Sequence, residues 1–254
     1  MEKFNKENLA RTIENKIGSI VENAPTVTRY RKPLVGFASA KDPLFTEMKE
    51  IIGPHHLHPL EMLPEGKTVI SFFLPFAKEI VKAQRAQTQV AREWAVAYIE
   101  TNELIAEISS ALIKELTAQN FKAVTQKATH NFNPTDLTAA WSHKSAAYVA
   151  GLGTFGLHHM LITPSGCSGR TGSVVTSAEI PASPRPSGEF CLYYKTGKCS
   201  FCVDHCPTAA LTEHGLDKQK CYRQLLEVDA SFPDLGLCDV CGKCAVGPCA
   251  LTSL

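Results

Sequence analysis

The chain has 254 residues, of which 44% are hydrophobic and 20% charged, an ordinary composition for a protein that buries its own core. Its 26 Lys and Arg balance 25 Asp and Glu, and the formal net charge of +1 argues against a nucleic-acid partner. No apolar run reaches the roughly 20 residues of a membrane span, and the polar start lacks a secretory signal. We therefore expect a cytoplasmic protein with no membrane partner.

Helices and strands alternate in the first three quarters of the sequence. Short runs rich in Val, Ile and Phe predict buried strands, and apolar residues at helical spacing in stretches without Gly or Pro predict helices. In chain order we expect strands at 32–40 and 67–75, one long helix or a pair of helices within 80–120, a helix at 135–150, and strands after 158 and at 168–180. This mixture predicts an α+β fold.

A strip rich in Pro, Ser and Gly at 181–190 marks a change of composition. We place a domain boundary near residue 185, which gives an α+β domain at 1–185 and a small domain at 186–254. Nine of the ten cysteines lie between Cys191 and Cys249. A reducing compartment favours metal or redox chemistry over disulfides for such a group.

The stretch CSFCVDHCP at 199–207 contains CxxCxxxCP, the part of the bacterial ferredoxin run in which the cysteine before proline ligates the second of two clusters. The run would begin with a cysteine at position 196, which is occupied by Thr196. Cys191 can replace it if the segment containing Gly197 loops out. A zinc site is disfavoured, because tetrahedral zinc needs only four ligands and no crossed arrangement. The pattern therefore predicts two 4Fe–4S clusters.

The ligands are expected to form two sets. They are Cys191, Cys199, Cys202 and Cys249 for cluster 1, and Cys206, Cys221, Cys241 and Cys244 for cluster 2. Cys238 is an alternative ligand: it could serve together with Cys241, with Cys244 closing cluster 1 and Cys249 left free. We favour the first assignment, because a CxxC pair followed by a distant cysteine after proline resembles the ferredoxin arrangement. Cys167, alone upstream, is expected to be a small buried or loop thiol.

GLGTFG at 151–156 matches the letters of the dinucleotide-binding motif GxGxxG. That motif needs a strand before it and a helix after it, whereas here a predicted helix precedes the glycines and a strand follows them. Gly151, Gly153 and Gly156 instead indicate a tight turn at which the backbone closely approaches another element or a flat cofactor.

The segment 141–180, followed by the cysteine pattern, resembles the epoxyqueuosine reductase family in a short form without the C-terminal helical extension, and the related reductive dehalogenases. This resemblance implies a nitroreductase-like α/β domain that holds a corrinoid (cobalamin), followed by a small bacterial-type two-cluster ferredoxin-like domain. An external donor of the ferredoxin or flavodoxin type would supply electrons, and a small-molecule substrate would be reduced. There are two alternatives. One is a reductase that uses a flavin in place of the corrinoid, and the other is an electron-transfer or binding module that has the two clusters but no corrinoid.

The same resemblance suggests residues at the site. The family has a proton-donating aspartate before the glycine turn, and Asp136 is the nearest match here, although capping of the predicted helix would also explain it. The lysine and asparagine that follow the family's turn are replaced by Leu157 and His158. His158 and His159 flank the glycine turn and are candidates for contact with the cofactor or the substrate; the alternative is that each is a core or surface histidine.

Overall fold

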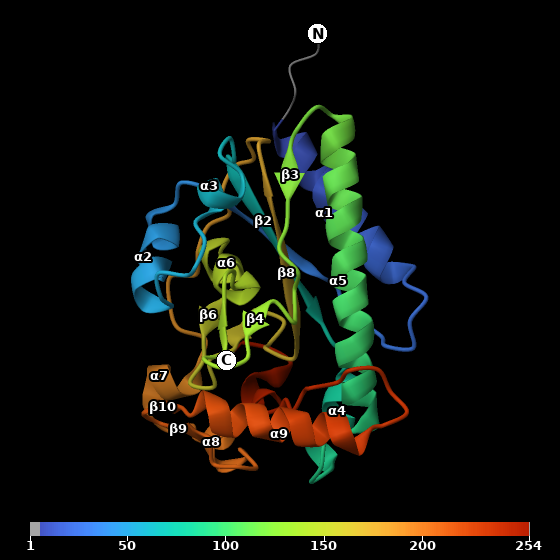
Figure 1. Cartoon of the computed structure of the whole chain (residues 1–254), viewed down its shortest axis with the longest axis vertical. Helices are drawn as coiled ribbons and strands as arrows, with labels where there is room; N and C mark the ends of the chain where they lie inside the picture. Colours follow the sequence, from blue (N-terminus) through green and yellow to red (C-terminus); the bar gives the residue numbers. More distant parts are fainter. Residues whose placement is uncertain (1–5, 254) are drawn as a thin grey trace.

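A computed structural model describes residues 6–253. Its central element is an antiparallel four-stranded sheet with the strands in the order β1–β2–β8–β3 (Figure 1). These strands are β1 (Leu34–Ser39), β2 (Thr68–Pro75), β8 (Gly169–Thr176) and β3 (Ala123–Val124). The strands predicted at 32–40, 67–75 and 168–180 are thus confirmed, and they form one sheet.

The strand β2 is buried along its whole length because helices cover both faces of the sheet. Side chains of a strand alternate between faces, and Phe72 and its alternate neighbours pack with α1 (Lys6–Glu22) and α5 (Arg92–Ala118). Val69 and Phe73 face the opposite side, which is covered by α2 (Pro43–Ile51), α3 (Pro59–Met62) and α6 (His143–Val149). Each such buried side chain contributes about 1.5–3 kcal/mol to stability, so this layer is a rigid support.

The stretch 80–120 was predicted to form one long helix or a pair of helices, and the structure contains a pair. They are α4 (Lys78–Ala86) and the 27-residue α5, which runs along the sheet (Figure 1). Ile105, Ile108 and Leu112 are buried on one face of α5, which agrees with their helical spacing.

The helix predicted at 135–150 is wrong in its first half. Residues 132–139 form a hairpin of β4 (Phe132–Asn133) and β5 (Thr138–Ala139), and α6 begins only at His143. Leu137 adopts a positive φ of 55°, which an α-helix does not allow. The helix starts where Ser142 accepts a hydrogen bond from the backbone N–H of Ser145.

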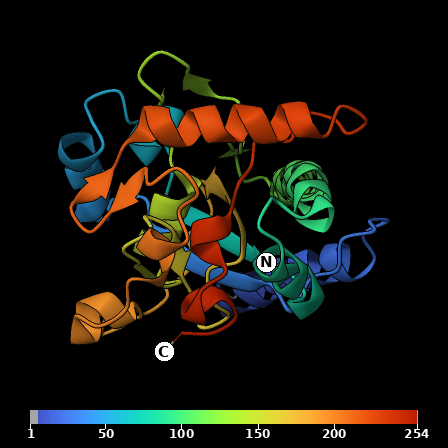
Figure 2. The ribbon, with the colours of Figure 1, turned by 90° about the horizontal axis from the view of Figure 1, so that it is seen from below.

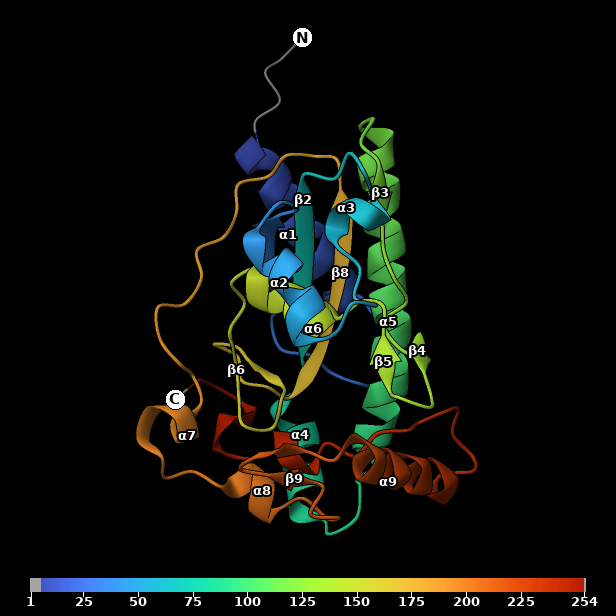
Figure 3. The ribbon, with the colours of Figure 1, turned by 60° about the vertical axis from the view of Figure 1, so that its left-hand side comes forward.

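The cysteine-rich region lies across one end of the sheet (Figures 1 and 3). Its elements are short apart from α9: they are α7 (Leu192–Thr196), α8 (Phe201–Asp204), β9 (Leu211–Thr212), β10 (Gly215–Leu216), α9 (Lys218–Ser231), and the 3₁₀ turns Lys243–Ala245 and Pro248–Ala250. The view from below shows α9 spanning the width of this end (Figure 2). The predicted domain boundary falls in 181–190, which contains no helix or strand, and the division into two domains stays a prediction. Within residues 6–253 no helix is long and apolar enough to cross a membrane.

The C-terminal end of α4 holds the last cysteines against the sheet layer. Lys243, which is almost fully buried, donates hydrogen bonds from Nζ to the carbonyls of Gln84 (2.7 Å) and Gln87 (2.6 Å). Carbonyls at a helix C-terminus lack partners within the helix and attract cations. Arg85 in turn donates from Nε to the carbonyl of Val246 at 2.6 Å. These contacts fix the cysteines on either side of Lys243 relative to the sheet.

Candidate functional site

A cavity of about 530 Å³ lies between the cysteine-rich region and the end of the sheet. Its wall combines Trp94 and Tyr98 of α5, Arg170 of β8, Met160 of the loop before β7 (Leu161–Ile162), and Tyr222 of α9. The volume lies within the range of about 300–1,000 Å³ typical of ligand pockets, and much of the wall is apolar or aromatic. This cavity is the candidate substrate and cofactor site.

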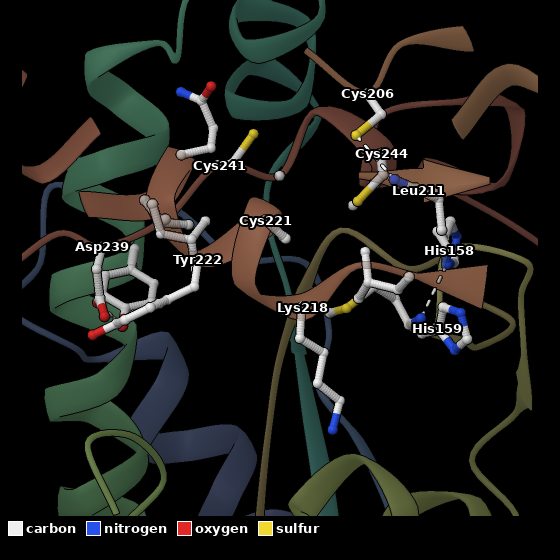
Figure 4. Close-up of a pocket in the computed structure, with 18 of the residues that line it drawn as sticks. His158, His159, Cys206, Leu211, Lys218, Cys221, Tyr222, Asp239, Cys241 and Cys244 are labelled. Carbon is white, nitrogen blue, oxygen red and sulfur yellow. Dashed lines mark hydrogen bonds between the residues drawn. The ribbon is translucent and has the colours of Figure 1, made fainter. Parts of the chain in front are cut away.

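One predicted set of cysteines lines this cavity, namely Cys206, Cys221, Cys241 and Cys244. Figure 4 shows Cys206, Cys241 and Cys244 close together, with His158 and His159 on one side of the view and Tyr222 and Asp239 on the other. Burial raises the pKa of Cys221 to about 11, and the nearby Cys241 and Cys206 add to this increase. The Cys221 thiol is therefore protonated in the metal-free protein, and a metal group that binds it must displace its proton.

The other predicted set, Cys191, Cys199, Cys202 and Cys249, surrounds a second and smaller cavity next to the first. The helix α7 lies between the first two members and ends at Thr196, and the next residue, Gly197, has a left-handed φ of 68° that turns the chain back. Cys191 therefore reaches the position left without a cysteine by Thr196. Burial raises the pKa of Cys202 to about 11, and Cys249, Cys191 and Cys199 raise it further.

The two sets meet at Cys244, which lines both cavities. Burial raises the pKa of Cys244, and the proximity of Cys241 of its own set and Cys202 of the other raises it further. Both sets of thiols are free of disulfides. Two adjacent groups of four thiols are a donor set that suits iron–sulfur clusters.

Cys238 lies outside both cavities. Its side chain is fully buried and packs with Ala95 and Tyr98 of α5. Its backbone N–H donates to Asp229 Oδ1 at 2.7 Å, and burial raises the pKa of its thiol to about 11. The structure therefore does not bring this alternative ligand to either set.

The glycines of the 151–156 turn pack against the protein itself. A Cβ on Gly153 would lie 1.9 Å from the carbonyl oxygen of Ile162, and one on Gly151, whose φ is 78°, would lie 2.4 Å from that of Pro184. Neither is among the residues that line the 530 Å³ cavity. Gly156 has a different surrounding, since its Cβ would lie 2.7 Å from Cε1 of His158.

His158 and His159 both line the cavity, and His158 lines the smaller cavity as well. They lie in the loop between β6 (Thr154–Phe155) and β7. His158 is buried, and its Nε2 lies 3.4 Å from Cys249 Sγ. Burial lowers the pKa of His159, and Lys144 lowers it further.

Cys167 is the buried thiol that the sequence predicted, and it also approaches a cysteine set. Its Sγ lies 3.8 Å from Cys249 Sγ and 3.4 Å from the carbonyl oxygen of Ala245. His158, Cys167 and Cys249 each offer one possible metal-ligand atom, and these three atoms lie within 4.8 Å of one another. Hydrogen bonds from Cys167 and from His158 lower the pKa of Cys249.

Asp136 is exposed in the turn between β4 and β5. Its carboxylate accepts hydrogen bonds from the hydroxyl (2.6 Å) and the backbone N–H (3.1 Å) of Thr138, and these bonds lower its pKa. Its neighbour Leu137 lines the cavity, whereas Asp136 does not. A general acid needs a pKa near the working pH, so Asp136 is not poised for that role in this conformation.

Sequence reasoning missed a polar group in the cavity wall. The Tyr98 hydroxyl donates to Asp239 Oδ1 at 2.6 Å, and the Arg170 guanidinium lies 4.4 Å from the centre of the Tyr98 ring. Burial raises the pKa of Tyr98 to about 12 and lowers that of Arg170. Among residues 6–253 the buried Nε of Arg170 has no hydrogen-bond partner. The available signals were an aspartate between two cysteines and an arginine within a predicted strand.

Two lysines line the same cavity. Lys144 Nζ donates to the carbonyl of His159 at 2.8 Å, and Lys218 lies exposed in the first turn of α9. Burial lowers the pKa of Lys144, and the proximity of Lys218 adds to the decrease. This pair is a local source of positive charge that the net charge of the chain does not reveal.

No model of a known protein family matches the chain. Among curated proteins it is 24% identical to epoxyqueuosine reductase of Bacillus cereus over 225 residues, which cover 79% of this chain and 54% of that protein. It is 35% identical to the enzyme of the same name from Staphylococcus aureus over 99 residues, which cover 38% of this chain and 24% of that protein. The chain therefore spans about half the length of the first of these relatives, and less of the second.

The fold of the chain is similar to the folds of solved epoxyqueuosine reductases and reductive dehalogenases. An epoxyqueuosine reductase with an epoxyqueuosine-modified tRNA-Tyr stem loop matches with a TM-score of 0.63 at 18% identity, over 97% of this chain and 66% of that one. A catabolic reductive dehalogenase in complex with 3-bromo-4-hydroxybenzoic acid matches with a TM-score of 0.57 at 15% identity, over 93% of this chain and 32% of that one.

The tRNA-containing structure contradicts our expectation about partners. The exclusion of nucleic acid was inferred from a net charge near zero, but net charge averages over the whole surface. The small-molecule substrate was expected from the family resemblance. Contact with a stem loop needs only local cations, and Lys144 and Lys218 are placed at the cavity. The mixed α/β fold and the sequence together make this chain similar to the epoxyqueuosine reductases.

Proposed function

We propose that this chain is an iron–sulfur reductase that acts on a modified nucleoside carried by tRNA, of the epoxyqueuosine type. The observation that carries the proposal is the pair of adjacent four-cysteine sets, one of which opens into the 530 Å³ cavity. The names of the curated relatives support the reaction, and the stem loop in one structural relative supports the substrate class.

In this proposal the cysteine sets hold two 4Fe–4S clusters, assigned as predicted, with Cys238 outside them. Residues 1–185 would form the nitroreductase-like domain and residues 186–254 the ferredoxin-like domain. The 530 Å³ cavity would hold a corrinoid, with His159 and Met160 among the residues that contact it. When bound, the clusters supply one-electron transfer and the corrinoid a low-valent cobalt that reduces the substrate.

The cavity residues would bind and orient the substrate. Lys144 and Lys218 are placed to contact backbone phosphates, which fix a nucleic acid in position without reading its sequence. Tyr222 offers an aromatic face on which an unstacked base can lie. The unpaired Nε of Arg170 is a donor for a polar group of the ligand.

Reduction of an epoxide to an alkene consumes two electrons and two protons and releases water, so the site also needs an acid. Asp136 can serve only if the turn between β4 and β5 moves its carboxyl into the cavity. One epoxyqueuosine reductase structure is described with its catalytic aspartate loop swung out of the active site, which supports such a movement in that protein. We propose the same role for the turn that carries Asp136.

The test is anaerobic purification with iron, cobalt and flavin analysis, followed by incubation with reductant and an epoxyqueuosine-containing stem loop. We expect iron and cobalt in the protein and, after nucleoside digestion, a product that lacks one oxygen atom by mass spectrometry. Cys221→Ser is the matched inactive variant, and Asp136→Asn should slow turnover without loss of iron. An iron- and cobalt-loaded protein that leaves the stem loop unchanged would refute the substrate, and protein without iron would refute the reductase.

A further inference from the structure

The loop between β6 and β7 directs His158 toward Cys249. The buried ring forms part of the wall of both cavities, and its Nε2 lies 3.4 Å from Cys249 Sγ, within hydrogen-bonding distance for sulfur. Gly156 leaves the space that the ring occupies, because a Cβ there would lie 2.7 Å from Cε1. The sequence predicted that another element or a cofactor would approach this glycine closely, and in the structure the His158 ring does so.

The other ring nitrogen fixes the tautomer of His158. The backbone N–H of Met160 donates to Nδ1 at 3.0 Å, so Nδ1 carries a lone pair. A neutral imidazole has one N–H, which must then lie on Nε2. The atom that faces Cys249 is therefore a hydrogen-bond donor.

Backbone hydrogen bonds place Cys249 opposite this donor. The N–H of Cys167 donates to the carbonyl of Cys249 at 3.0 Å, and that of Ser168 donates to Ala250 at 3.1 Å. Gly166, with a φ of 78°, permits the approach, because a Cβ there would lie 2.3 Å from the carbonyl oxygen of Ala250. These contacts fix the position of the Cys249 backbone.

Cys167 is a weaker donor to the same sulfur. Its Sγ is 3.8 Å from Cys249 Sγ but 3.4 Å from the carbonyl oxygen of Ala245, which is the stronger acceptor for its single proton. His158 is therefore the principal side-chain donor to Cys249.

We propose that His158 is a positioning residue that donates a hydrogen bond from Nε2 to the ligand sulfur of Cys249 and thereby raises the reduction potential of cluster 1. The inference rests on the proposed function, since it requires that Cys249 ligate a cluster. Reduction adds negative charge to the cluster and its sulfurs, so an N–H donor stabilises the reduced form more than the oxidised form. Removal of the donor lowers the potential of the cluster that Cys249 ligates and leaves that of the other cluster unchanged.

The experiment is an EPR-monitored redox titration of the anaerobically reconstituted full chain, with iron content measured in parallel. In His158→Phe we expect full iron, with one midpoint potential lowered and the other unchanged. The oxidised-to-reduced ratio of the affected cluster at a fixed potential should rise about tenfold, which corresponds to about 59 mV for a one-electron couple. His158→Gln keeps an N–H donor and should restore most of the shift.

His159→Phe is the matched control, because the hydrogen bond from Lys144 engages the His159 backbone carbonyl and not its ring. Its midpoint potentials should equal those of the wild type. Cys167→Ser should retain full iron, and loss of a cluster there would make Cys167 a ligand and overturn the arrangement. If the phenylalanine ring prevents cluster assembly, His158→Ala gives the same readout.

Two results would overturn the inference alone. One is an iron-loaded His158→Phe protein with both potentials unchanged. The other is loss of one cluster in His158→Ala and His158→Gln alike, because His158 would then be a ligand. Wild-type protein that binds no iron overturns the proposed function together with the inference.

Discussion

The sheet layer and the cysteine-rich region lie side by side but are held together by different forces. All eight residues of β2 are buried, and α5 buries Ile108 and Leu112 completely. By contrast, the 14-residue α9 buries only Val228, and α7 buries no residue. The sheet layer thus has an apolar core of its own. We expect the cysteine-rich region to depend on metal bound by its thiols, together with the apolar contacts that it makes with α4 and α5.

Removal of iron should give the largest difference in stability between the sheet layer and the cysteine-rich region. After oxidation and chelation under mild conditions, we expect amides at 199–206 and 218–231 to lose protection in hydrogen–deuterium exchange, while those of β2 and β8 stay protected. Metal binding to a region with little apolar core contributes directly to its folding. Equal protection of both regions before and after iron removal would contradict the difference.

Shortening a leucine in each region gives the next largest effect. Leu112→Ala should lower the free energy of unfolding by about 2–5 kcal/mol, because it leaves a cavity in the core of the sheet layer. Leu226→Ala in α9 is the matched variant, and it should cost less than about 0.5 kcal/mol because Leu226 is 44% exposed. Denaturant unfolding of the iron-loaded proteins measures both values, and similar losses would remove the distinction.

A buried histidine gives the sheet layer its own dependence on pH. Burial lowers the pKa of His143 to about 4, and its Nδ1 lies 2.7 Å from Ser173 Oγ. The unfolded chain therefore takes up a proton near pH 6.5 that the folded chain resists until about pH 4, so stability falls as pH decreases through this window. The loss is on the order of 3 kcal/mol, and His143→Gln should flatten the slope of unfolding free energy against pH. An identical slope in the variant would show that His143 is not responsible.

In both regions, the features that could be predicted are those with a local sequence pattern. The apolar runs of β2 and the spacing of Ile105, Ile108 and Leu112 report burial directly, so these elements were identified from sequence. The cysteine spacing similarly predicted two sets of four thiols. The members of each set line one cavity, and their role as cluster ligands stays a prediction. Both signals are local patterns with a direct physical cause.

Features that depend on distant parts of the chain were not predicted. His158 and Cys249 are 91 positions apart, and they meet through the backbone pairing of Cys167 with Cys249. Tyr98 and Asp239 are 141 positions apart. The error at 135–150 has another cause: apolar residues there face the cavity from a hairpin, and burial alone does not separate a hairpin from a helix.

The cluster assignment is the central claim, and iron content tests it most directly. Anaerobically reconstituted wild type and Cys238→Ser should each hold about eight irons per chain, and Cys249→Ser should hold about four, with acid-labile sulfide in proportion. Cys238 is buried away from both sets, whereas Cys249 lines the same cavity as Cys191, Cys199 and Cys202. Full iron in Cys249→Ser together with loss of iron in Cys238→Ser would contradict the account.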